Sequence, residues 1–141
     1  MIDDLLAELG EQLEVQRVTL RLPAEDSVFP IAYEWCAPSV HSIRDTPRLD
    51  MSKQPVVLKM VGGASQVVED DCATASPDPV YHEMRELFGG LQAQIVTALR
   101  DDDGEIVGLL SVHDLTAPRT WSDAEQAWAR ETADEIRGLL G

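Results

Sequence analysis

Five side chains in this sequence are the best candidates to bind a metal ion or to act as a nucleophile or base: Cys36, Cys72, His41, His82 and His113. No two of them have a spacing typical of metal ligands, such as C-x-x-C or H-x-x-x-H, so we expect no metal site. A nucleophilic cysteine needs a base and electropositive surroundings that lower its thiol pKa, and an acidic chain opposes both. The sequence therefore does not predict an enzyme.

The charge of the chain restricts its partners. Acidic residues outnumber basic ones by 26 to 11, which gives a formal net charge of −15. Such a chain repels phosphates and anionic lipids, so we expect neither nucleic acid nor membrane as a partner. The charge can serve solubility or docking to a basic protein. With no signal peptide, no apolar run of membrane-spanning length and only two cysteines, we expect a cytoplasmic protein with reduced thiols.

The elements that must position these side chains follow from hydrophobic periodicity. At 141 residues the chain has room for one domain, 1–141, with one sizeable core. Residues 2–13 carry apolar residues at helical spacing. Residues 17–22 alternate between polar and apolar, which predicts a strand with one face in solvent. The other predicted strands are 28–36, 66–69, 91–100 and 106–113.

The two last strands form the strongest pattern. Both are apolar at nearly every position, and an Asp-Gly turn at 103–104 joins them, so we expect a central hairpin covered on both faces. The acidic run around this turn lacks the spacing of a calcium loop. A short helix is predicted at 52–60, and irregular segments at 38–49 and 70–77.

Two helix starts have clear caps. Asp78 followed by Pro79 predicts a helix through residue 88, and Ser122 with Glu125 forms a capping box at the start of the last helix. The order of elements predicts an α+β domain, in which helices flank an antiparallel sheet.

Two short motifs then suggest a family. The strand G-L-L-S-V-H at 108–113 is followed by P-R-T-W at 118–121, after an acidic stretch, a loop and a helix. This order resembles the GAF domains of cyanobacteriochromes and phytochromes. The resemblance implies a GAF-like antiparallel sheet with the N- and C-terminal helices on one face. Short helices and loops would lie over a pocket on the other face.

The sequence departs from that family pattern at one decisive position. Tyr81 stands where these relatives carry the cysteine that attaches a bilin, followed by the matching His82. A phenol cannot form the thioether bond, so covalent attachment there is excluded. Cys72 lies where some relatives carry a second cysteine, but we do not expect attachment through it alone. The cofactor, if any, is therefore unknown.

The resemblance also implies a set of ligand-binding residues around the pocket: Tyr33, Trp35, Asp70, Tyr81, His82 and His113. Each has a simpler alternative. Tyr33 and Trp35 can be core residues, and Asp70 can belong to a solvated acidic loop. The two histidines can be ordinary residues at a helix start and at a strand end.

Two functions remain open. The first is a sensory domain that binds a small molecule between the sheet and the helix starting near Asp78, and signals through a partner protein or a dimer interface. The alternative is a GAF scaffold that binds no ligand, with Met84, Phe88 and Trp35 filling the pocket, and acts as an interaction or dimerisation module. The apolar stripes of the terminal helices lead us to expect a homodimer in either case.

Overall fold

The computed structural model describes residues 1–23, 29–44 and 51–140, and part of the predicted loop at 38–49 lies outside them. Its strands form one antiparallel sheet in the order β2-β1-β5-β4-β3. Their bounds are β1 Arg17–Arg21, β2 Ile31–Cys36, β3 Gln66–Glu69, β4 Ala93–Arg100 and β5 Ile106–Asp114. The predicted hairpin is therefore β4 and β5, and β5 is the central strand.

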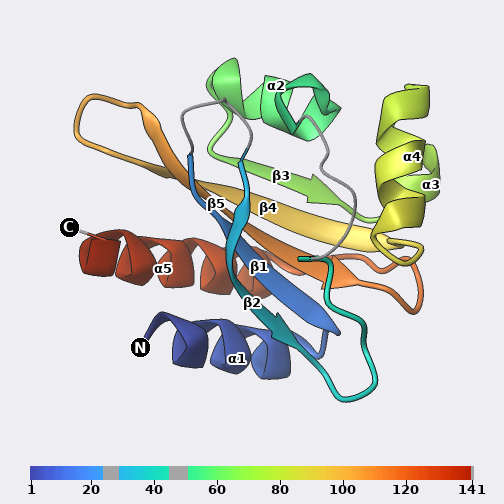
Figure 1. Ribbon diagram of the computed structural model, residues 1–141, viewed down its shortest axis with the longest axis horizontal. Helices are drawn as coiled ribbons and strands as arrows, with labels where there is room; N and C mark the ends of the chain where they lie inside the picture. The colour runs from blue at the N-terminus through green and yellow to red at the C-terminus, as the bar shows by residue number, and fades with distance from the viewer. Residues whose placement is uncertain (24–28, 45–50, 141) are drawn as a thin grey trace.

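Helices cover the two faces of this sheet differently (Figure 1). The long terminal helices lie side by side on one face, and the short helices lie on the other. Their bounds are α1 Ile2–Leu13, α2 Pro55–Val61, α3 Cys72–Ala75, α4 Pro79–Leu87 and α5 Asp123–Leu140. This arrangement confirms the expected α+β fold with a two-sided sheet.

Each face of the sheet has its own apolar core. The core beneath α1 and α5 contains leucines of α1 and aliphatic residues of β1, β4 and β5. The core beneath α2, α3 and α4 contains Met60, Cys72, Tyr81 and Phe88, together with Leu109 of β5. The two cores share the sheet, so side chains that alternate along one strand enter different cores.

The prediction that β1 has one face in solvent is wrong. All five of its residues are buried, including Arg17, Thr19 and Arg21. The reason is topological: β1 lies between β2 and β5 rather than at an edge, and the short-helix side of the molecule covers its polar face. Two arginines are thereby placed in the interior.

Three smaller features refine the predicted helices. The helix expected at 52–60 is a 3-10 turn, Met51–Lys53 (η1), followed by α2 from Pro55. The segment expected to be irregular at 70–77 contains the short helix α3, which Asp71 caps through the Ala73 amide. The capping box of α5 is confirmed, because Ser122 and Glu125 bond each other's backbone amides reciprocally.

Gly10 allows α1 to lie close to β2. A β carbon at this position would overlap the six-membered ring of Trp35, although alanine is a better helix former than glycine. We therefore expect Gly10→Ala to lower the free energy of unfolding by about 1–2 kcal/mol, because the overlap outweighs the helix propensity. Chemical denaturation measures this change.

Gly138 of α5 is the matched control. It is exposed, and a β carbon added there meets no atom within 4 Å. Gly138→Ala should therefore raise the stability by up to about 1 kcal/mol. If both substitutions stabilise the protein equally, the close approach of α1 to Trp35 is wrong.

Candidate functional site

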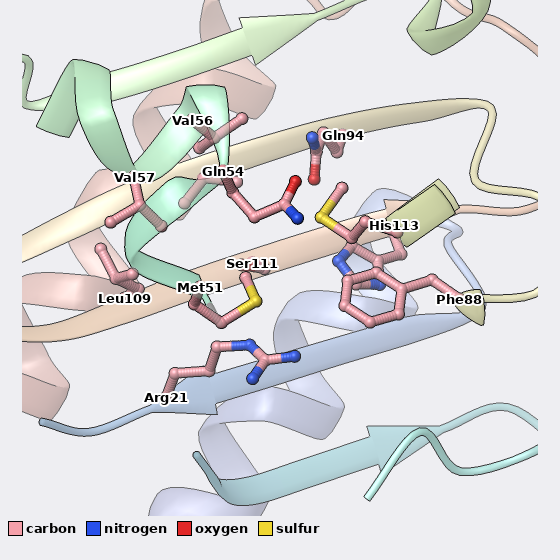
Figure 2. Close-up of a pocket in the computed structure, with 12 residues that line it drawn as sticks. Arg21, Met51, Gln54, Val56, Val57, Phe88, Gln94, Leu109, Ser111 and His113 are labelled. Atoms are coloured by element: carbon pink, nitrogen blue, oxygen red, sulfur yellow. The ribbon is translucent and has the colours of Figure 1, made fainter. Parts of the chain in front are cut away.

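A small cavity lies between the sheet and the short helices (Figure 2). Its volume is about 20 Å³, which is room for roughly one water molecule. Four polar side chains enter it from the sheet and a fifth, that of Gln54, from the residue before α2, while apolar side chains of η1, α2 and α4 close it. The lining residues are Arg21, Met51, Gln54, Val56, Val57, Met84, Phe88, Gln94, Val96, Leu109, Ser111 and His113.

His113 is the predicted site residue that lines this cavity directly. It is buried at the end of β5, and its ring stacks on Phe88 with centroids 5.6 Å apart. Burial, reinforced by the charges of Arg17 and Arg21, holds the pKa of His113 well below its usual range. The imidazole is therefore neutral near pH 7, with one nitrogen that donates and one that accepts.

Tyr81 lies next to the cavity rather than in its wall. It is fully buried at the start of α4, and its hydroxyl donates to Glu69 Oε1 at 2.7 Å. The side-chain amide of Gln94, which lines the cavity, donates to the same oxygen at 2.6 Å. Glu69, Tyr81 and Gln94 thus form a buried polar cluster that joins β3, α4 and β4. Burial strongly raises the pKa of Tyr81, so its phenol stays protonated.

His82 holds the start of α4 and does not line the cavity. Arg85 Nη1 lies 3.2 Å from His82 Nδ1, and His82 Nε2 lies 2.7 Å from the Ser76 carbonyl oxygen. Because the arginine can only donate, Nδ1 accepts and the hydrogen sits on Nε2, which donates to Ser76. This histidine therefore fixes the loop before α4.

The structure places three predicted site residues away from the cavity. Tyr33 and Trp35 pair with Leu20 and Val18, so they face α1 on the opposite side of the sheet. Tyr33 and Trp35 share one face of β2, as the sequence predicts, but this face packs against α1 and not against the cavity. Asp70 is exposed beyond the end of β3, where its carboxylate accepts from the Trp121 amide at 3.2 Å.

Sequence reasoning missed most of the polar lining. Arg21, Gln54, Gln94 and Ser111 were not predicted, and Phe88 only as a residue that fills space. The available signal was the alternation of Arg17, Thr19 and Arg21, which is the same for a solvent face and for a polar interior. Only the tertiary structure, in which β1 lies between β2 and β5 with its polar face covered, distinguishes a polar interior from a solvent face.

Four buried polar atoms among the described residues have no hydrogen-bond partner, and all four lie on the cavity side of the molecule. Three are on the sheet and one is at the start of α2: Arg17 Nε, Thr19 Oγ1, His113 Nδ1 and Gln54 Oε1. Buried polar groups are normally paired, and each unpaired one costs about 1–3 kcal/mol. Gln54 and His113 line the small cavity, whereas Arg17 and Thr19 lie on the same face of the sheet outside its lining. Unpaired polar atoms in a cavity wall are typical of a site that a ligand or ordered water completes.

A second, larger hollow of about 260 Å³ lies on the other side of Phe88. It is open to solvent between the segment after β2 and the C-terminal end of α4. Its lining residues are Arg17, Ser39, Val40, His41, Ser42, Ile43, Leu87, Phe88, Gly89 and Leu115. Phe88 therefore lines both spaces.

Neither cysteine has the surroundings of a nucleophile. Cys72 is fully buried, and burial raises the pKa of its thiol to about 11. Burial also raises the pKa of the half-buried Cys36, as does the nearby carboxylate of Glu34. Within residues 1–23, 29–44 and 51–140, no group of three or more metal-ligating side chains comes together. None of the helices described is long and apolar enough to cross a membrane.

The family model of the GAF domain matches residues 1–139. The chain belongs to the GAF domain family. Solved GAF domains share its fold over nearly its whole length. The blue-light absorbing form of the PixJ GAF domain of Thermosynechococcus elongatus aligns with a TM-score of 0.82 at 21% identity. The alignment covers 99% of this chain and 82% of that one.

Two further GAF domains show the same similarity. GAF3 of Slr1393 from Synechocystis sp. PCC6803, in its photoproduct state, aligns with a TM-score of 0.81 at 17% identity, over 99% of this chain and 90% of that one. JSC1_58120g3, solved with bound biliverdin, aligns with a TM-score of 0.76 at 21% identity, over 96% and 84%. No protein of curated function matches the sequence. At these identities the similarity establishes the GAF fold alone.

Proposed function

We propose that this GAF domain is a sensory domain that binds a small molecule non-covalently between the sheet and α4. The observation that carries the proposal is the group of four unpartnered polar atoms on this face of the sheet, two of which belong to cavity-lining residues, Gln54 and His113. A ligand with polar groups would satisfy them, whereas apolar filling alone would not. The relative solved with biliverdin supports a small-molecule ligand for this fold. Tyr81 supports a ligand other than a thioether-bound bilin.

The size of the cavity indicates how binding would produce a signal. About 20 Å³ admits no organic ligand, so Phe88 must move for one to enter. Phe88 ends α4 and is followed by Gly89 and Gly90, which have φ values of 85° and 84°. Displacement of the ring would therefore shift the end of α4 and the following turn, and a ligand would select this shifted state.

The alternative function, an interaction module without a ligand, also has a specific observation in its favour. Met84 and Phe88 are both buried and close the cavity, which leaves little space. Apolar residues at the end of α5, Leu139 and Leu140, are 46% and 38% exposed and could contribute to a homodimer. A cytoplasmic location, a signalling partner and the absence of catalysis are part of both proposals.

The proposal is tested by thermal unfolding and native mass spectrometry of the freshly purified protein with a metabolite panel. We expect at least one compound to bind and to raise the stability by about 2.7 kcal/mol at a hundredfold excess over its Kd. Ser111→Val, which puts methyl groups into the cavity wall, should abolish this shift. Ser65→Val, at an exposed position before β3, should preserve it.

A protein that remains empty and unshifted across neutral, cationic and anionic compounds would contradict the sensory proposal. A dimer that forms under the same conditions, measured by analytical ultracentrifugation, would then favour the interaction module. Replacing Cys36 and Cys72 with serine should leave ligand binding unchanged in a folded protein, because neither thiol lines the cavity.

A further inference from the structure

Two arginines of β1 are buried without a carboxylate partner. Arg17 is 1% exposed and Arg21 is 9% exposed, and among the described residues neither forms an ion pair. Arg17 donates twice to the Phe88 carbonyl oxygen, at 2.6 and 2.8 Å, and Arg21 donates to the Phe29 carbonyl oxygen at 2.7 Å. Carbonyl oxygens satisfy hydrogen bonds but do not neutralise a charge. The carboxylate of Glu34 acts on both arginines from beyond ion-pair distance and offsets the effect of their burial only in part.

These charges are unusual for this chain, whose net charge is −15. Twenty-six acidic residues are available, yet none in the described chain reaches either guanidinium within ion-pair distance. Burial lowers the pKa of Arg21 to about 10 and also lowers the pKa of Arg17. Both shifts have the sign that burial imposes on a cation, the carboxylate of Glu34 opposes them only in part, and both arginines stay charged near pH 7.

Unpartnered donors surround the two arginines. Arg17 pairs across the sheet with His113, and Thr19 pairs with Ser111. Arg17 Nε, Thr19 Oγ1 and His113 Nδ1 are three of the four unpartnered buried atoms. The hydroxyl and the guanidinium donate, and the neutral imidazole can donate from Nδ1. The polar face of β1 and β5 is thus a continuous surface of donors, which suits an oxyanion.

Phe88 covers this surface. Its ring stacks on His113, the Arg21 guanidinium lies 5.5 Å from the ring centroid, and its carbonyl oxygen accepts from Arg17. All three contacts would compete with a bound anion. An oxyanion that binds Arg17 takes the place of the Phe88 carbonyl and so releases the end of α4.

We propose that the ligand is a small organic anion, with its carboxylate or phosphate group bound between Arg21, which lines the cavity, and Arg17, which lines the larger hollow on the other side of Phe88. Its apolar body lies against Val57, Leu109 and the displaced Phe88. This inference rests on the proposed function and names the chemical class that the site takes. Anion binding is coupled to the movement of Phe88, Gly89 and Gly90, because the Arg17 guanidinium binds either the Phe88 carbonyl oxygen or the anion.

The test compares each acid with its neutral amide on the wild-type protein, by calorimetry and by protein-observed NMR. The probes are benzoate and benzamide, phenylacetate and phenylacetamide, indole-3-acetate and indole-3-acetamide, with phenyl phosphate as a phosphate. We expect at least one acid or phosphate to bind at least about tenfold more tightly than its neutral counterpart, as charge-assisted bonds predict. The same ligand should shift the amide signals of Gly89 and Gly90.

The arginine variants test the location. Arg21→Gln should weaken binding of the best acid about tenfold or more. Arg130→Gln removes the same charge from an exposed position on α5, where the side chain bonds only Gln66, and should change binding less than about twofold. Thr19→Val is a second variant that keeps all charges and removes one donor, and it should weaken binding severalfold.

The outcomes separate this inference from the proposed function. If the amides bind as tightly as the acids and shift pocket signals, the anion inference is overturned while the sensory proposal stands. If Arg130→Gln weakens binding as much as Arg21→Gln, the acids bind elsewhere and the inference is again overturned. If no probe and no metabolite binds, both proposals are overturned together. The comparison of acids with amides does not require Arg21→Gln to fold, because those pairs are measured on the unmodified protein.

Discussion

Phe88→Ala is expected to lower the free energy of unfolding by about 3–5 kcal/mol, as for other buried aromatic residues that are replaced by alanine. The Phe88 ring is buried and stacks on His113, and the residue lines both the 20 Å³ cavity and the 260 Å³ hollow. Removal of the ring takes apolar surface out of the core and enlarges the cavity. Urea denaturation measures the loss.

The enlarged space should also bind an apolar ring. Indole or benzene should restore part of the lost stability to Phe88→Ala and have no effect on the wild-type protein, since an aromatic ring can take the place of the missing one against His113. Leu87→Ala is the matched control. Leu87 is the neighbouring residue of α4 but is 36% exposed, so its loss should cost less than about 1 kcal/mol. A loss of that small size for Phe88→Ala would show that the ring is not packed as described.

The second large effect is expected at Glu69. Its Oε1 accepts from both the Tyr81 hydroxyl and the Gln94 amide, and all three residues are buried. Glu69→Ala leaves two donors without a partner in a place that water does not reach freely. At about 1–3 kcal/mol for each unsatisfied group, the free energy of unfolding should fall by about 2–5 kcal/mol. Thermal and urea unfolding measure this value.

Two companion variants separate the hydrogen bonds from the charge. Glu83→Ala removes an exposed carboxylate from α4 and should change the stability by less than about 0.5 kcal/mol. Tyr81→Phe removes one of the two bonds to Glu69 and should cost less than Glu69→Ala. If Glu69→Ala and Glu83→Ala have equal effects, the buried cluster contributes nothing to the fold.

The Tyr81 cluster has a consequence for function as well. Tyr81, the position at which the sequence resemblance implies an attaching cysteine, carries a phenol that holds β3, α4 and β4 together. Tyr81 is therefore used for structure, and the polar groups free to meet a ligand lie further along the sheet. The site proposed from the structure therefore lies near Phe88, at the end of α4, and not near Tyr81 at its start, where the sequence placed it.

Local patterns determined much of the fold from the sequence. The stripe of α1, the Asp78–Pro79 start of α4, the capping box of α5 and the β4–β5 hairpin were all predicted, because each depends on neighbours within a few residues. The resemblance to GAF domains supplied the two-sided sheet. The resemblance also implied His113 as a pocket residue, and this histidine lines the cavity, but its binding role stays a prediction.

Only the tertiary structure decided which face of each strand meets the cavity. A period of two shows that Arg17 and Arg21 lie opposite Val18, and that Tyr33 and Trp35 share a face, but it does not say what covers either face. That depends on the pairing of β1 with β5, more than 80 residues away in sequence, and on α1 and α4 lying on opposite sides. The sequence thus determined the GAF elements. Long-range strand pairing decided that two arginines are buried in an acidic protein and that two aromatic residues lie outside its pocket.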